Sequence, residues 1–217
     1  MRVEAVLYDF DHTLVESPLD FAAMRRGVLR VCDIYGVTIT DPEHKLVLEI
    51  VEEGAGQLDA DLASKFRGKA DQCVREVERK AALHTRALPG VAESLRRLRA
   101  EGRKVAIITR NCREVVETAL GSAGLEHDVL LARDDVPRVK PDPEHAAEAL
   151  ARLGVRPEHA VLVGDFAADI TCARDAGIPA IGVTTGASSA ADLRRAGALV
   201  VLDGAAQVPD WLATEGW

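Results

Sequence analysis

Two aspartates follow the first apolar segment of the chain. The segment covers residues 3–8 and leads directly into the sequence DFDHT at residues 9–13. Side chains two residues apart in an extended chain point to the same side, so Asp9 and Asp11 would present a pair of carboxylates. The carboxyl end of a strand is also where open α/β sheets bind their ligands. Taken alone, the pattern also fits an acidic turn after a strand.

A second acidic cluster has the same relation to an apolar segment. The sequence GDFAAD occupies residues 164–169 and follows the apolar residues 160–163. If a helix begins near Phe166, Asp165 and Asp169 lie about one turn apart on one face. Taken alone, the cluster also fits a helix N-cap and a first-turn carboxylate that complements the helix dipole.

The two clusters together predict a cation site. They would bring several carboxylates to the same edge of a sheet, where a like-charge pair at ~4 Å costs on the order of 4 kcal/mol at an effective dielectric constant near 20. A bound cation would remove that repulsion. Ligands that are all oxygen atoms favour Mg²⁺ over Zn²⁺.

A hydroxyl and an ammonium complete the set of candidate site residues. Thr109 ends the predicted strand at residues 104–108, and Lys140 precedes Pro141, which favours an extended conformation at the lysine. Both groups suit the binding of a phosphoryl group. Each also has a simpler explanation, because Thr109 can cap the helix that starts near Asn111 and Lys140 can be a solvated loop residue.

The elements that must position these residues alternate between strand and helix. Helices are predicted after Pro89, taken as a first helical residue with Gly102 as the stop, and over about 112–123, 142–153 and 188–196. This alternation predicts a doubly wound, parallel-sheet α/β core of the Rossmann type. The predicted buried strands are residues 3–8, 104–108, 128–131, 160–163, 180–183 and 198–202.

Residues 16–86 interrupt the alternation and contain no strand-like pattern. Apolar residues recur there at helical spacing, which predicts an all-helical cap domain inserted after the first strand, with residues 1–15 and 87–217 forming the catalytic core. Gly36 and the pair Asp41-Pro42 separate its first two helices. The segment from Gly54 to Gly56 separates the second helix from the third, in which Gly68 is expected to add a kink.

Composition limits the partners and the cellular compartment. The 217 residues include 27 Lys and Arg against 35 Asp and Glu, a net charge of −8, and no dense basic cluster, so we do not expect nucleic acid as a partner. The four cysteines form no CxxC pair, and the first apolar segment is interrupted by Glu4, unlike a signal peptide or a membrane span. These features favour the cytoplasm. They do not indicate the oligomeric state.

The order of the four motifs identifies a family resemblance. The chain has Asp-x-Asp-x-Thr, then a Thr at a strand end, then Lys-Pro, then Gly-Asp-x-x-x-Asp, with the helical insert between the first two. In this it resembles the haloacid dehalogenase-like (HAD) superfamily, specifically the phosphoglycolate-phosphatase-like branch with a helical cap. The stretch at residues 175–186, DAGIPAIGVTTG, also looks typical of that branch.

The resemblance implies a Mg²⁺-dependent phosphatase acting on a small phosphorylated metabolite. Asp9 would be the nucleophile that forms a phospho-aspartate, and Asp11 would be the general acid and later the general base. Asp9, the backbone carbonyl of Asp11 and Asp165 would hold Mg²⁺. Asp169 would orient Lys140 or a metal-bound water.

The resemblance also implies the residues that contact the phosphoryl group. Thr109 and Lys140 would bind the transferring oxygens and stabilise the transition state. Thr13 would stabilise the turn after the nucleophile, and the backbone around Arg110 and Asn111 would donate hydrogen bonds to the phosphate. The Arg110 side chain would contact a second anionic group of the substrate or form a surface ion pair.

Two positions depart from the commonest family pattern. His12 stands where Gly is frequent, and it either adopts a positive φ or reaches toward the substrate. Phe166 stands where a small or hydroxyl residue is common. Neither change removes a catalytic group.

Two other functions remain open at the level of sequence. A phosphomutase of the same branch would use the same phospho-aspartate and return the phosphate to another oxygen of a sugar. A non-enzymatic phospho-acceptor or binding protein also combines Asp, Thr and Lys on a doubly wound sheet. Its acceptor would follow a middle strand, however, whereas Asp9 follows the first.

Overall fold

The computed structural model describes residues 2–217, apart from the side chain of Ser122. Its internal contacts divide the chain into two compact units. The first contains the residues up to Ser17 together with Thr85–Trp217, and the second is Pro18–His84. Within residues 2–217 no helix is long and apolar enough to cross a membrane, and no pair of cysteines in that range forms a disulfide.

The first unit is built on a parallel six-stranded sheet with the order β5-β4-β1-β6-β7-β8. All six strands lie within two residues of the predicted bounds, which confirms the predicted fold class. They are β1 Ala5–Tyr8, β4 Lys104–Ile108, β5 Val129–Leu131, β6 Ala160–Gly164, β7 Ala180–Val183 and β8 Val200–Leu202.

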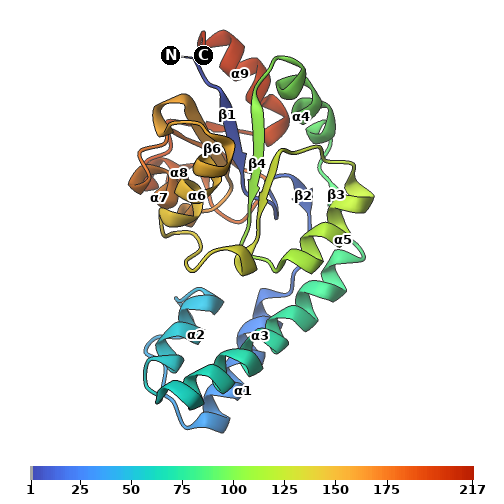
Figure 1. Cartoon of the computed structure of the whole chain (residues 1–217). Coiled ribbons are helices and arrows are strands. Elements are labelled where there is room, and N and C mark those ends of the chain that lie inside the picture. The colour runs from blue at the N-terminus through green and yellow to red at the C-terminus, as the bar shows by residue number, and fades with distance from the viewer. Residues whose placement is uncertain (1) are drawn as a thin grey trace. The chain divides into compact units, whose positions relative to one another are not determined.

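Helices cover both faces of this sheet, as Figure 1 shows. The helices α4, α5 and α9 contribute to the core on one face, and α6, α7 and α8 contribute to the core on the other. Their bounds are α4 Val91–Ala100, α5 Arg113–Ala123, α6 Glu144–Leu153, α7 Ala167–Asp175, α8 Ala190–Ala196 and α9 Val208–Thr214. Three short 3-10 helices, Arg133–Asp135, Pro157–His159 and Ala205–Gln207, lie in the connections.

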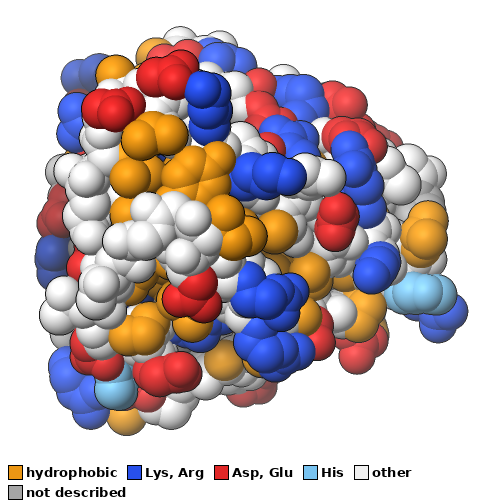
Figure 2. All heavy atoms as spheres, turned by 90° about the horizontal axis from the view of Figure 1, so that it is seen from below, with side chains coloured by type: hydrophobic (Ala, Val, Ile, Leu, Met, Phe, Trp, Pro, Cys, Tyr) orange, Lys and Arg blue, Asp and Glu red, His pale blue; other side chains and the backbone are white. Residues whose placement is uncertain are grey.

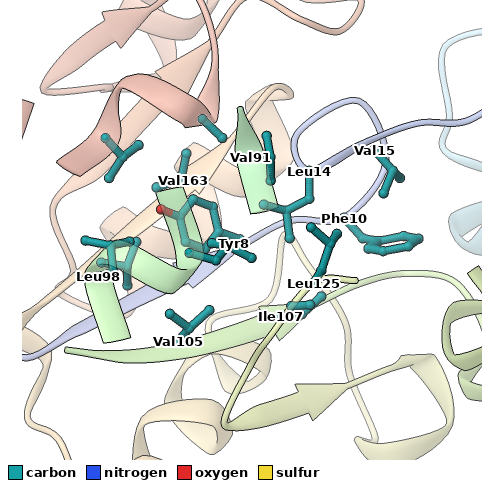
Figure 3. Close-up of a cluster of buried hydrophobic side chains, with 14 of the residues drawn as sticks. Tyr8, Phe10, Leu14, Val15, Val91, Leu98, Val105, Ile107, Leu125 and Val163 are labelled. Atoms are coloured by element: carbon teal, nitrogen blue, oxygen red, sulfur yellow. The ribbon is translucent and has the colours of Figure 1, made fainter. Parts of the chain in front are cut away.

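The central strand β1 is buried on both faces because its side chains alternate between the two cores. Val6 and Tyr8 belong to one core, and Ala5 and Leu7 belong to the other. Figure 3 shows Tyr8 in the first core. All four residues are fully buried, and burial of each large aliphatic side chain contributes about 1.5–3 kcal/mol. The sheet therefore holds the end of β1 rigidly.

Two details of the helices differ from the prediction. Pro89 is not the first helical residue, because Gly90 has φ +77° and is the N-cap, so α4 begins at Val91. A left-handed residue cannot continue a right-handed helix, which places Pro89 in the preceding turn. The short helix α9 was not predicted. It has only seven residues, too few for a periodic pattern to stand out.

A second, two-stranded sheet joins the places where the chain leaves and re-enters the first unit. Strand β2, Val15–Glu16, pairs antiparallel with β3, Arg86–Ala87. The expectation that residues 16–86 contain no strand is therefore wrong at both ends of that range. Strands of two residues are too short to show an alternating pattern.

The second unit contains three helices around a core of its own. They are α1 Phe21–Tyr35, α2 Val47–Ala55 and α3 Ala60–Ala82. The rings of Tyr35 and Phe66 meet edge to face with centroids 5.4 Å apart. Phe66 also packs so closely on Gly54 that a Cβ there would lie 2.6 Å from its ring. Helix α3 continues through Gly68 without interruption.

The surface of the helical unit includes a largely hydrophobic hollow of about 400 Å³. Figure 2 shows the molecule from below, where hydrophobic side chains gather between acidic and basic ones. The hollow is lined by Val31, Ile34, Tyr35, Leu62 and Lys69. The helical unit therefore has apolar side chains on its surface, such as Ile34 and Leu62, besides those buried in its core.

Candidate active site

Three neighbouring strands of the sheet end side by side. The central strand β1 pairs with β4 on one side and with β6 on the other, and Tyr8 lies opposite both Ile107 and Val163. Asp9 follows β1 directly, and Asp165 follows the last residue of β6. Thr109 likewise follows the last residue of β4. The sequence-predicted residues of three separate motifs are therefore brought to one edge of the sheet, which is where such sheets bind ligands.

The loop after β1 is anchored by apolar side chains between the polar ones. Phe10 and Leu14 are buried at 1% and 0% exposure, and Figure 3 shows both in the hydrophobic cluster that also contains Ile107. The turn is closed by His12, which has φ +56° and donates its N–H to the carbonyl of Val15 at 2.7 Å. The positive-φ interpretation of His12 is confirmed.

Lys140 joins the two acidic clusters. Its Nζ lies 2.5 Å from Oδ1 of Asp9 and 2.8 Å from Oδ1 of Asp169. The lysine side chain is only 1% exposed, so it is not the solvated loop residue that the sequence left possible. Burial by itself lowers the pKa of Lys140, but Asp169 and Asp9 outweigh burial and raise the pKa well above its usual value. The ammonium therefore stays charged.

Asp9 and Asp169, which contact this ammonium, form a cluster with a third carboxylate, that of Asp165. Asp9, Asp165 and Asp169 each offer an oxygen, and the three oxygens lie within 4.8 Å of one another. Burial raises the pKa of Asp165, and the charges of Asp9 and Asp169 raise it further. Burial also raises the pKa of Asp169, although Lys140 opposes the shift.

The cluster fits a divalent cation. With all three carboxylates ionised, as binding of a cation would require, the carboxylates and the ammonium have a local charge of −3 + 1 = −2, which a divalent cation would balance. Burial, and next the charges of Asp9 and Asp169, raise the pKa of Asp165, so part of the shift reflects the repulsion between carboxylates that a bound cation would relieve. Asp9, Asp165 and Asp169 are thus the carboxylates that would hold the cation. The carboxylate of Asp11 is not in this group.

The remaining predicted residues contact the acidic ones. Asn111 donates from Nδ2 to Oδ2 of Asp11 at 2.6 Å, and its own N–H donates to Oγ1 of Thr109 at 3.1 Å. Thr13 is fully buried and donates its hydroxyl to Oδ1 of Asp165 at 3.1 Å. In this arrangement Asn111 and Thr13 orient the two carboxylates.

The backbone of Arg110 is also tied into the loop next to Thr109. Its carbonyl accepts a hydrogen bond from Nη1 of Arg133 at 2.7 Å. This bond connects the peptide group between Arg110 and Asn111 to the segment after β5. The residue that directly follows Thr109 is therefore held to that segment.

Two glycines pack directly against the side chains of Asp169 and Asp165. A Cβ on Gly164 would lie 2.4 Å from the side chain of Asp169, and a Cβ on Gly186 would lie 1.7 Å from Oδ2 of Asp165. Neither position therefore accepts a larger residue unless a carboxylate moves. Both glycines occur in motifs that the sequence singled out, but which side chains approach them depends on long-range packing.

We expect Gly186→Ala to weaken divalent-cation binding about 10- to 100-fold, the usual range for residues that orient metal ligands. The added methyl group would displace Oδ2 of Asp165. Isothermal titration with Mg²⁺ measures the effect. The control is Gly121→Ala on α5, where a Cβ meets no atom within 4 Å. Equal affinities for Gly186→Ala and the parent protein would show that Asp165 does not bind the cation.

One buried polar residue near the site was not singled out from the sequence. His145 lies in the first turn of α6 and is fully buried. Its Nδ1 accepts the N–H of Lys140 at 3.3 Å, and its Nε2 lies 3.2 Å from the carbonyl of Leu131. Burial, and next the charge of Lys140, lowers the pKa of His145 to about 3.

This shift predicts a pH effect on stability. The folded pKa of His145 is about 3 against an ordinary value of 6.5, so its contribution to stability is complete above pH 6.5 and is lost as the pH falls toward 3. Lys140 and Arg110 favour the neutral ring, and Asp135 opposes them. We expect His145→Gln to flatten the slope of unfolding free energy against pH by up to about 1.4 kcal/mol per pH unit.

Urea unfolding at several pH values between about 4 and about 6 measures that slope. His127→Gln, in the segment before β5, provides the matched removal of a histidine from the same unit. An unchanged slope in His145→Gln would mean that the ring is protonated in the folded protein at these pH values.

Comparisons with known proteins agree with this geometry. A family model described as haloacid dehalogenase-like hydrolase matches residues 6–183. A phosphoglycolate phosphatase of Nitrosospira multiformis is 30% identical over 184 residues, covering 82% of this chain and 81% of that protein. The pyrophosphatase PpaX of Bacillus cereus is 40% identical over 194 residues, covering 82% and 81%.

A solved structure shows the same relationship. A Thermotoga maritima protein, itself a proposed beta-phosphoglucomutase, is 29% identical with a TM-score of 0.63, and the match covers 98% of this chain and 99% of that one. The family match extends over most of the first unit and all of the second. The chain therefore belongs to the haloacid dehalogenase-like hydrolases, in their phosphoglycolate-phosphatase-like branch, and is a phosphoric monoester hydrolase.

Proposed function

We propose that the enzyme is a Mg²⁺-dependent phosphatase that hydrolyses a small organic phosphomonoester, such as phosphoglycolate or a sugar phosphate, through a phospho-aspartate on Asp9. The strongest support is the ion cluster, in which Lys140 contacts both Asp9 and Asp169. An oxygen of Asp165 lies within 4.8 Å of an oxygen of each of these two aspartates. The proposed nucleophile, the ammonium of Lys140 and the candidate metal site thus lie close together.

In the first step, an oxygen of Asp9 attacks the phosphorus atom and the bond from phosphorus to the leaving oxygen breaks. Asp11 donates a proton to that oxygen, so the product leaves as an alcohol. The amide of Asn111, 2.6 Å from Oδ2 of Asp11, keeps the acid in place. Thr109 and the ammonium of Lys140 contact the oxygens of the transferring group, on which negative charge is concentrated.

In the second step, Asp11 takes a proton from a water molecule, and the water oxygen attacks the phosphorus atom. The bond between phosphorus and Asp9 breaks, which releases inorganic phosphate, regenerates the carboxylate of Asp9 and leaves Asp11 protonated for the next turnover. Mg²⁺ held by Asp9 and Asp165 would neutralise charge between the nucleophile and the phosphate. The contact of the Lys140 ammonium with Oδ1 of Asp9 holds the nucleophile in place at the site.

The helical unit Pro18–His84 is proposed to be the cap domain that selects the substrate. The proposal rests on the position of the unit in the chain, because it follows the loop of Asp9 and Asp11 and ends just before β3. The candidate specificity segments are 36–43, 54–56 and the region of Arg86. Exchange of these segments with those of a relative would test which of them select the substrate.

Phosphate release from a panel of phosphomonoesters tests the proposal. The panel contains phosphoglycolate, sugar phosphates, nucleotides and an aryl phosphate, each with Mg²⁺ and with EDTA. We expect release that requires Mg²⁺ and is fastest for a small substrate. No release from any compound under either condition would reject the phosphatase assignment.

A phosphomutase is the second candidate, favoured by the 29% identity to the Thermotoga maritima protein. It would form the same phospho-aspartate but would transfer the phosphate to another hydroxyl of the sugar. Incubation of a hexose phosphate followed by separation of its isomers distinguishes the two reactions. An isomerised product without free phosphate would establish the mutase.

A further inference from the structure

His145 makes two hydrogen bonds that together define its protonation state. Nδ1 faces the backbone N–H of Lys140, which is a donor, so Nδ1 must accept. Nε2 faces the carbonyl of Leu131, which is an acceptor, so Nε2 must carry the hydrogen. Only the neutral ring with hydrogen on Nε2 satisfies both partners. The low pKa of His145 agrees with a neutral ring.

The carbonyl of Leu131 connects this ring to the end of β4. The same oxygen accepts the backbone N–H of Thr109 at 2.9 Å and the ring of His145 at 3.2 Å. A carbonyl oxygen has two lone pairs, so it can accept both bonds. Thr109 and Lys140, which come from separate segments of the chain, are therefore joined through one carbonyl and one imidazole.

The backbone of Lys140 takes part in this connection and lies outside the sheet. Its side chain is held by Asp9 and Asp169, but its backbone lies in the segment between β5 and α6, outside the sheet. The N–H of Lys140 donates to His145, and Asp142 closes a turn onto the carbonyl of Val139. A group that contacts a transferring phosphoryl oxygen must be held within about 0.5 Å of its productive position.

We infer that His145 is a positioning residue, which fixes the backbone of Lys140 relative to Thr109 and so sets the spacing of the two groups that bind the transferred phosphoryl group. The inference rests on the proposed function. A buried histidine that only filled the core would be satisfied by any two polar groups. Of the two partners of this ring, one is the backbone of Lys140 itself. The other is the carbonyl that accepts the N–H of Thr109.

Three substitutions separate the two hydrogen bonds. His145→Asn places an amide oxygen near Nδ1 and keeps an acceptor for Lys140. His145→Gln places an amide NH₂ near Nε2 and keeps a donor for Leu131. His145→Leu removes both bonds at similar volume. His127→Leu is the matched control outside the site.

Steady-state kinetics with an aryl phosphate at saturating Mg²⁺ test the inference. We expect His145→Leu to lower kcat about 10- to 100-fold with little change in KM, as for other residues that orient active-site groups. His145→Asn and His145→Gln should each have a kcat between those of His145→Leu and the parent enzyme, because each keeps one of the two hydrogen bonds. If folded His145→Leu keeps kcat within about twofold of the parent enzyme, the inference is wrong. If His145→Leu does not fold, unchanged kcat in both amide variants would also show that the inference is wrong.

A spectroscopic measurement tests the arrangement without any turnover. Nitrogen-15 NMR of the parent protein near neutral pH is expected to show the His145 ring as the Nε2–H tautomer. Amide hydrogen exchange at Lys140 should be slow in the parent protein and faster in His145→Leu. A charged ring, the Nδ1–H tautomer or unchanged exchange would overturn the inference. A parent enzyme that releases no phosphate would instead count against the proposed function, and the NMR result would still stand.

Discussion

Asp9→Asn is expected to lower kcat by on the order of 10⁴-fold or more while the protein stays folded. An amide cannot attack phosphorus as a carboxylate does, and the substitution also removes one ligand of the candidate cation. The fold should persist because Asn has nearly the same shape and because one of three mutually repelling carboxylates is removed. Phosphate release and thermal unfolding, measured on the same preparation, check both parts.

The control for this variant is Asp175→Asn, at the end of α7, whose partner is Arg174 on the surface. It removes the same charge from the same unit, and its turnover is expected to stay within about twofold of that of the parent enzyme. If Asp9→Asn retains turnover within tenfold of the parent enzyme, Asp9 is not the nucleophile. If Asp9→Asn unfolds, rescue of the fold by added Mg²⁺ or phosphate would allow the turnover test to proceed.

Lys140→Met is expected to abolish turnover and to lower the free energy of unfolding by about 3–5 kcal/mol in the absence of metal. The ammonium is 1% exposed and contacts Asp9 and Asp169. Its removal would leave three buried or half-buried carboxylates without a compensating charge. Urea unfolding in EDTA measures the loss.

Mg²⁺ should restore part of the stability of Lys140→Met, because the cation would supply positive charge to the same carboxylates. It should not restore turnover, because Lys140 would no longer contact the phosphoryl oxygens. The control is Lys104→Met at the start of β4, whose ammonium contacts the carbonyl of Leu153. Equal stabilities of Lys140→Met and the parent protein in EDTA would show that the ion cluster is not a stabilising contact.

The strands of the sheet could be predicted because burial on both faces gives a continuous apolar run. The run at 104–108 is the clearest case, and it forms β4 with the predicted bounds. The site aspartates could be located because each follows such a run directly. The register of the sheet then brings Asp9 and Asp165 together, which depends only on parallel pairing of adjacent strands.

The residues that were missed depend on contacts between distant segments. The approach of Gly186 to Asp165 joins the loops after β7 and β6, and no local pattern shows which side chain will lie against a glycine. The contacts of His145 with Lys140 and Leu131 leave no periodic signal either. Its position five residues after Lys140, on the apolar face of a helix, was the only sign available.

Detection of the phospho-aspartate is the most direct test of the central claim. The enzyme is mixed with Mg²⁺ and its best phosphomonoester, quenched rapidly in acid and digested, and the phosphorylated peptide is sequenced by mass spectrometry. We predict one phosphoryl group on Asp9, absent from Asp9→Asn and lost when the reaction continues without further substrate. Phosphate release with no phosphorylated peptide, or with the phosphoryl group on another residue, would contradict the proposed mechanism.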